Sequence, residues 1–194
     1  MKSRYLDGYE VEALKGALPR YMWLPLAVAA ETGLRVGDVV ALRRADFDSG
    51  GFRYTAAKTG KEGYAPIGAS LMADLWEEWA RIDSEWCFPS PYKSGRHLTR
   101  QAVWARVKRA CEKGGVRPAG ASPHSLRKVY AVKECKRHGI EATKEALQHD
   151  RISTTEIYAL ADWTSGECAE MPLTRGDIVR IAGIVADMIG GKRE

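Results

Sequence analysis

The sequence lacks any apolar run that could span a lipid bilayer, which would require about 20 consecutive apolar residues. Its first ten residues, MKSRYLDGYE, are polar and do not resemble a secretory signal peptide. These two absences argue against an integral membrane protein and against a secreted one. We therefore expect a cytoplasmic protein that has no membrane partner.

Paired cysteines are absent as well. Cys87, Cys111, Cys135 and Cys168 are widely separated and form no Cys-x-x-Cys pair, so the sequence indicates neither a zinc site nor a disulfide framework. Cys135 and His138 have a spacing that metal ligands can show, but no second pair lies in range. No carboxylates are clustered at metal-ligand spacing either. We expect reduced, structural cysteines, no metal and no other cofactor.

The chain is small and moderately basic. Its 194 residues are enough for one well-packed domain and too few for two large ones. Lys and Arg number 30 against 25 Asp and Glu, which gives a net charge of +5. This charge suits a polyanionic partner, although moderate basicity is common in proteins that never bind nucleic acid.

The first part of the chain predicts two helices. Residues 9–18 have helical spacing and end at Pro19, and residues 21–32, YMWLPLAVAAET, are apolar on almost all sides. We expect the second helix to lie in the centre of the domain. Gly33 then breaks the pattern before VGDVVAL resumes it.

Arg35 stands between these two apolar segments and therefore needs an anionic partner, because desolvating a charge is costly. Spacing alone leaves two alternatives. Arg35 forms a buried ion pair, for instance with Glu31 or Asp38, or it binds a phosphate group.

Residues 52–67, FRYTAAKTGKEGYAPI, predict an antiparallel hairpin of two or three strands, because β-forming residues flank a glycine-containing turn. Lys58 and Lys61 lie near its tip. Most lysines at such a position are simply solvated. A hairpin tip can also bring a lysine close to DNA, where it can protonate a leaving oxygen.

Two further helices are expected on either side of a loop at residues 84–98. Residues 69–83 are amphipathic, and we interpret their apolar residues as packing rather than base-stacking groups: Leu71, Leu75, Trp76 and Trp79. Residues 99–113 carry basic side chains, which are Arg100, Arg106, Lys108, Arg109 and Lys113, predicted to lie opposite Val103, Trp104 and Val107. This basic face either contacts DNA in or along a groove or is a solvated surface.

Chemistry-bearing residues are concentrated between His124 and Tyr158. Ser122 and Pro123 begin a helix in which His124 precedes Arg127 by three residues, so both side chains share one face. Arginine holds two phosphate oxygens at once and stays charged, while histidine can exchange a proton near neutral pH. Tyr158, nine residues after His149, can act as a nucleophile if its proton is removed. The residue types therefore point to a phosphate-handling site.

This stretch resembles the catalytic box of the tyrosine recombinases, or phage integrases. His124, Arg127, His149 and Tyr158 match that box one by one, although Gln148 stands where the family usually has glycine. Thr32 to Arg35 match the family's Thr-Gly-Leu-Arg motif and Lys58 matches its hairpin lysine, so that all six positions are filled in order across residues 9–162.

The resemblance implies a fold, a reaction and a role for each of these residues. The fold is mainly α-helical with a small antiparallel β-hairpin or sheet. Tyr158 attacks a DNA phosphodiester and forms a 3′-phosphotyrosyl bond, and rejoining to another strand gives integration, excision or inversion. Arg35, Arg127 and His149 stabilise the phosphate, Lys58 protonates the departing oxygen, and His124 helps to remove or position the tyrosine proton. Predicted DNA contacts are Lys61, Arg100, Arg106 and Arg109.

The resemblance also implies partners. Double-stranded DNA is the expected substrate, and we expect residues 1–173 to form the catalytic domain, with residues 174–194 as a C-terminal helix. That helix either folds back on its own domain or docks on a neighbouring protomer of a tetramer assembled on paired sites. Family members usually carry an N-terminal DNA-clamping domain, so the chain is either the catalytic part of a longer integrase or a short member of the family. A catalytically silent DNA-binding regulator and a type IB topoisomerase are the alternative functions.

Overall fold

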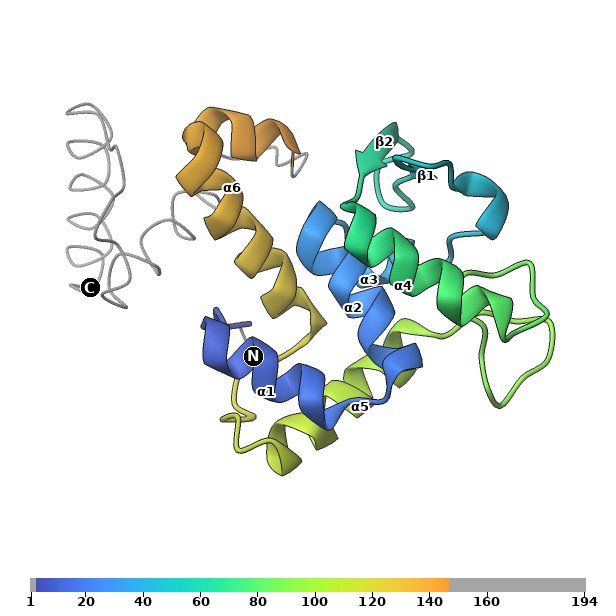
Figure 1. The fold of residues 1–194 in the computed structure, drawn as a ribbon. Coiled ribbons are helices and arrows are strands. Elements are labelled where there is room, and N and C mark those ends of the chain that lie inside the picture. Colours follow the sequence, from blue (N-terminus) through green and yellow to red (C-terminus); the bar gives the residue numbers. More distant parts are fainter. Residues whose placement is uncertain (1–2, 147–194) are drawn as a thin grey trace, which may run out of the picture. The chain divides into compact units, whose positions relative to one another are not determined.

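The computed structural model describes residues 3–146. The predictions for His149, Tyr158 and the helix at 174–194 lie outside these residues. The described part of the chain is mainly α-helical and includes one two-stranded antiparallel sheet (Figure 1). This arrangement confirms the predicted fold class. The chain divides into two compact units, Met1–Tyr130 and Ala131–Glu194.

The first unit opens with α1 (Gly8–Ala17) and α2 (Arg20–Thr32), as the apolar spacing predicts. The α1 helix begins with a capping box, because the Asp7 side chain accepts a hydrogen bond from the Glu10 N–H while the Glu10 side chain accepts one from the Asp7 N–H. Helix α2 is buried along most of its length and supplies a large share of the core.

The short helix α3 (Val36–Val40) and the 3₁₀ helix η1 (Arg44–Asp46) lead into the sheet. Strand β1 (Gly51–Thr55) pairs antiparallel with β2 (Glu62–Pro66), in a register that aligns Gly51 with Pro66. A side chain at Gly51 would place its Cβ 2.2 Å from the Ala65 carbonyl oxygen, so close pairing here requires glycine. The predicted hairpin is therefore confirmed in its two-stranded form.

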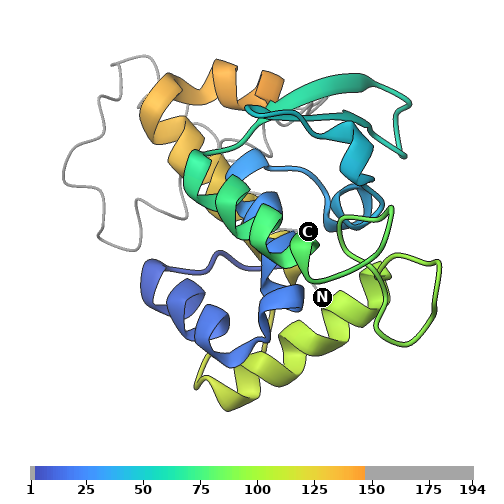
Figure 2. The same ribbon diagram turned by 45° about the vertical axis from the view of Figure 1, so that its right-hand side comes forward.

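Helix α4 (Ala69–Ala80) packs against α2, and α5 (Arg100–Lys113) lies beside α1 (Figure 2). The predicted apolar face of α4 is wrong at one position. Trp79 is buried, but Trp76 is 54% exposed and packs edge-on against Trp79, with ring centroids 5.2 Å apart.

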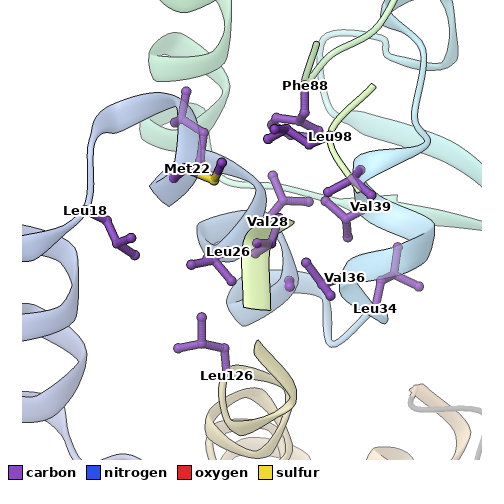
Figure 3. Packing of buried hydrophobic residues seen from close by; sticks show 14 of the residues in the cluster. Leu18, Met22, Leu26, Val28, Leu34, Val36, Val39, Phe88, Leu98 and Leu126 are labelled. Carbon is purple, nitrogen blue, oxygen red and sulfur yellow. The ribbon is translucent and has the colours of Figure 1, made fainter. Parts of the chain in front are cut away.

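Helix α6 (Pro123–Ala146) is interrupted at Gly139, whose φ of 82° lies in the left-handed region. The first helical stretch of α6 therefore ends at this glycine. At the other end of α6, Leu126 joins one apolar cluster with Leu18, Leu26 and Val36 (Figure 3). This packing fixes the turn of α6 that carries His124 and Arg127.

Candidate active site

The turn between α2 and α3 holds Arg35. Gly33 ends α2 in a left-handed conformation with a φ of 69°. The Thr32 hydroxyl donates to the Val28 carbonyl oxygen at 2.7 Å and accepts from the Leu34 N–H at 3.4 Å, which closes the turn. Arg35 is then the residue that precedes α3, and its side chain is half-buried.

Neither ion pair considered for Arg35 is present among residues 3–146. The Glu31 carboxylate accepts instead from the Gly68 N–H, and an Asp38 carboxylate oxygen accepts from the Ala57 N–H at 3.1 Å. Arg35 takes part in none of the ion pairs formed among the described residues. Phosphate binding therefore remains the prediction for this side chain.

Arg127 lies on the first turns of α6 and is buried, with 3% of its surface exposed. Its Nη1 donates a hydrogen bond to the Gly33 carbonyl oxygen. This bond ties α6 to the turn that carries Arg35, across 94 positions of the sequence. Two arginines from distant parts of the chain thus meet at one short turn: Arg35 belongs to it, and Arg127 binds its carbonyl oxygen.

A pocket with a volume of about 690 Å³ brings Arg35, His124 and Arg127 together. Three of the six predicted catalytic residues therefore line one cavity, with two guanidinium groups beside an imidazole. Such a site can hold a phosphodiester by charge-assisted hydrogen bonds. The last two predicted residues, His149 and Tyr158, lie outside the described residues.

His124 is accessible to solvent at this pocket. Its pKa lies below the ordinary histidine value, first because the pocket walls replace part of the surrounding water and then because Arg127, Lys128 and Arg35 are positively charged. Both causes disfavour the imidazolium form. His124 is therefore neutral at physiological pH and able to accept a proton.

Lys58 does not line the pocket. It lies exposed in the turn between β1 and β2, where the Ala56 N–H bonds to the Lys61 carbonyl oxygen at 2.8 Å. The turn is nevertheless attached to α3, because the Ala57 N–H that precedes Lys58 is the donor to Asp38. The other carboxylate oxygen of Asp38 is buried and has no hydrogen-bond partner among the described residues.

Asp38 is a residue that the sequence pattern did not single out for this role. It follows Arg35 by three residues, which is about one turn of a helix. Helix α3 therefore has Arg35 at its start and, through Asp38, holds the hairpin loop that contains Lys58. A carboxylate one turn after the arginine was the available signal, but it pointed equally well to an ion pair.

The four predicted DNA-contacting residues are distributed over the surface. Arg100 lines the pocket, whereas Lys61 is exposed in the hairpin turn. Arg106 donates to the Tyr92 hydroxyl at 2.7 Å, and Arg109 is exposed on α5 outside the pocket. Of these four residues, only Arg100 lines the pocket with the predicted catalytic residues Arg35, His124 and Arg127.

The predicted position of Trp104 on the apolar side of α5 is wrong. Trp104 is 50% exposed and lines the pocket with Arg100 and Lys108. The Lys108 Nζ lies 5.6 Å from its ring centroid and donates to the Pro118 carbonyl oxygen at 2.6 Å. Arg100, Trp104 and Lys108 are spaced four residues apart, and this spacing was the sequence signal that they share one face of the helix.

Within residues 3–146, helices that are both long and apolar enough to cross a membrane are absent. Groups of three or more His, Cys, Asp or Glu side chains arranged as metal ligands are likewise absent from this part of the chain.

Comparison with known proteins shows the family of this chain. Residues 4–163 match the model of the phage integrase family. Tyrosine recombinase XerD of Rhizobium meliloti is 36% identical over 136 residues, which are 66% of this chain and 43% of that protein. The chain thus spans less than half the length of this curated relative.

Solved structures show the same fold. Lambda integrase (residues 75–356), as a dimer bound to a COC′ core site, matches with a TM-score of 0.69 at 22% identity, over 81% of this chain and 59% of that one. The lambda integrase catalytic core matches with a TM-score of 0.65 at 22% identity, over 77% of this chain and 93% of that one. The chain therefore belongs to the phage integrase family and has the fold of a tyrosine recombinase catalytic domain.

Proposed function

We propose that this chain cuts and rejoins double-stranded DNA at specific sites through a 3′-phosphotyrosyl intermediate. The observation that carries the proposal is the pocket in which Arg35, His124 and Arg127 meet. Its cationic groups match the charge of a phosphodiester, and membership of the phage integrase family supplies the reaction class.

The proposed mechanism conserves bond energy. The Tyr158 oxygen attacks the phosphorus, forms a new P–O bond and releases the 5′-oxygen. Arg35 and Arg127 neutralise the non-bridging oxygens as negative charge builds, and His149 adds a hydrogen bond. His124 accepts the tyrosine proton, whereas Lys58 gives a proton to the departing oxygen. Attack by a 5′-hydroxyl then reverses these steps and rejoins the strands.

Self-association is part of the proposal. Lambda integrase structures that share the fold are described as a dimer bound to a core site and as a tetramer bound to a Holliday junction. We infer that this chain also acts as a tetramer on paired DNA sites. Residues 174–194 are the segment proposed to dock on a neighbouring protomer.

The DNA surface is proposed to extend from the pocket along α5. Arg100 and Trp104 line the same pocket as Arg35, His124 and Arg127. This shared pocket supports a role for both in contacting the nucleotides next to the cleaved phosphate. Lys61, Arg106 and Arg109 are proposed as contacts to more distant phosphates, which position the duplex without reading its sequence.

Covalent trapping tests the function. The protein is incubated in EDTA with a pool of nicked, partly randomised duplexes, and adducts that survive denaturation are digested and mapped by mass spectrometry. A nucleotide attached to the peptide that contains Tyr158 supports the proposal, and the trapped DNA gives the target sequence. Retained DNA binding with no adduct favours the catalytically silent regulator. An adduct on another residue contradicts the assignment of Tyr158 as the nucleophile.

Replacing Asp38 with asparagine is expected to slow cleavage about tenfold, because a poorly placed catalytic group loses much of its effect. The amide is a weaker acceptor for the Ala57 N–H, so the turn that carries Lys58 is held less firmly. A substrate with a 5′-sulfur leaving group needs no general acid and should restore most of the rate. Asp48→Asn is the control, since Asp48 accepts from Gly50 and Tyr64 elsewhere on the hairpin. A defect that the sulfur substrate leaves unchanged would contradict this role.

The pH dependence of cleavage should reveal the protonation of His124. Because its pKa is lowered, the residue stays neutral until the pH falls below the ordinary histidine value of about 6.5. The cleavage rate at saturating DNA should therefore remain level near neutrality and fall at more acidic pH, as the proton acceptor becomes charged. The same profile measured for His124→Gln should be lower and lack this acidic limb. An unchanged limb in the variant would assign it to another group.

A further inference from the structure

The loop at residues 114–122 joins α5 to α6 and leads directly to His124. Four successive carbonyl oxygens of this loop accept hydrogen bonds from outside it. The acceptors are Arg117, Pro118, Ala119 and Gly120, and the donors belong to Arg4 and Lys108. An isolated loop would leave these groups to water, so their position here is set by other parts of the chain.

Arg4 binds three of the four carbonyls. Its Nη2 donates to Arg117 at 2.8 Å, its Nε to Ala119 at 3.2 Å, and its backbone N–H to Gly120 at 2.9 Å. Both carboxylate oxygens of Glu10 meet the same guanidinium, at 2.5 and 2.6 Å. The planar guanidinium group of Arg4 thus links the start of α1 to a loop more than a hundred residues later.

The loop is in turn attached to the catalytic helix. The Gly120 carbonyl oxygen that Arg4 binds also accepts from the Ser125 hydroxyl at 3.3 Å. Ser125 is fully buried and directly follows His124. Gly120 itself lines the pocket together with His124 and Arg127. Any displacement of this carbonyl therefore moves a wall of the pocket.

The ion pair between Arg4 and Glu10 is suited to a permanent structural contact. The Arg4 and Glu10 side chains are 20% and 22% exposed, and the side-chain hydrogen bond between them lowers the pKa of Glu10 and raises that of Arg4. Both groups stay charged across the working range. A lysine cannot replace the fork, because a single ammonium group cannot reach two separate carbonyls and a carboxylate in one plane.

We propose that Arg4 is a positioning residue, which fixes the pocket positions of His124 and Arg127 by holding the carbonyls of Arg117, Ala119 and Gly120. Its effect on cleavage rests on the proposed function. Its effect on the geometry of His124 does not, and the two can be measured separately.

The test is Arg4→Lys in the full chain, which keeps the charge and loses the fork. The rate of strand cleavage at saturating DNA should fall about tenfold while the dissociation constant for DNA changes little, because alignment rather than binding is lost. In the same variant, NMR titration of the His124 ring should show its pKa rising toward the ordinary value. Loosening the loop admits water, which favours the imidazolium form.

Two further variants separate positioning from general stability. Glu10→Gln keeps Arg4 and its carbonyl contacts, so its effect on both readouts should be smaller than that of Arg4→Lys. Arg20→Lys removes a comparable fork between α2 and α4, where Arg20 bonds Asp74 and Glu77, and it should leave both readouts unchanged.

The outcomes are distinguishable. If the His124 pKa and the cleavage rate of Arg4→Lys equal those of Arg20→Lys, or if Glu10→Gln has the larger effect, the positioning role is overturned. If wild-type protein forms no adduct with DNA, the proposed function fails. A shift of the His124 pKa in Arg4→Lys alone would then still support the positioning role.

Discussion

Tyr158→Phe is expected to abolish formation of the covalent DNA adduct, with a loss of about 10⁴-fold or more, the scale seen when a covalent nucleophile is removed. Phenylalanine keeps the ring and lacks only the oxygen that forms the phosphotyrosyl bond. DNA affinity should change little, because in the proposed mechanism the arginines, and not the nucleophile, hold the phosphate. Denaturing gels of nicked-duplex reactions give the first quantity, and fluorescence anisotropy gives the second.

Tyr64→Phe is a suitable control. Its hydroxyl donates to Asp48 at 2.7 Å on the exposed surface, so the variant removes a tyrosine oxygen without touching the pocket. Normal cleavage by Tyr64→Phe and none by Tyr158→Phe would assign the nucleophile. Cleavage by Tyr158→Phe near the wild-type rate would contradict the assignment and leave another residue to be found by mapping the adduct.

Arg127→Lys should lower the cleavage rate by a factor of about 10² to 10³, the usual cost of losing one donor to a developing oxyanion. The substitution weakens two contacts of the guanidinium at once, one to the Gly33 carbonyl and one to the phosphate. An ammonium group cannot contact the Gly33 carbonyl and a phosphate with the geometry of the guanidinium fork. The burial of Arg127 makes the change more severe, because little water is present to replace the missing donors. Single-turnover cleavage at saturating DNA measures the effect.

A loss of stability must be separated from a loss of catalysis in this variant. Arg44→Lys provides the comparison, since Arg44 is partly buried and donates to the Ile82 carbonyl oxygen away from the pocket. Thermal unfolding of both variants should show similar decreases, while only Arg127→Lys loses cleavage. Equal loss of cleavage in the two variants would contradict a direct role for Arg127.

Local patterns were sufficient for most of the fold. Apolar spacing predicted α2, α4 and α5, and the glycine-containing turn predicted the β1–β2 hairpin. The spacing of three residues between His124 and Arg127 correctly placed both on one side of α6, where they line one pocket. These successes share a cause, because helix and strand periods are properties of neighbouring residues.

Contacts between distant residues were not predictable in the same way. The bond between Arg127 and Gly33 spans 94 positions, and the bonds of Arg4 to the carbonyls of Arg117, Ala119 and Gly120 span more than a hundred. Such contacts leave no periodic pattern in the sequence. Trp104 was misplaced because it adjoins the buried Val103, and an adjacent residue on a helix turns by only about 100°. A large aromatic there satisfies the core pattern or the pocket pattern equally well.

The Gly33 turn has an electrostatic consequence. The turn bears Arg35 and its Gly33 carbonyl oxygen accepts from Arg127, so two positive side chains line one pocket. After desolvation, the charges of Arg127, Lys128 and Arg35 further lower the pKa of His124. A bound phosphodiester would add negative charge beside these cationic groups. A DNA ligand that binds the folded domain and not the unfolded chain would then raise the stability of the domain by mass action.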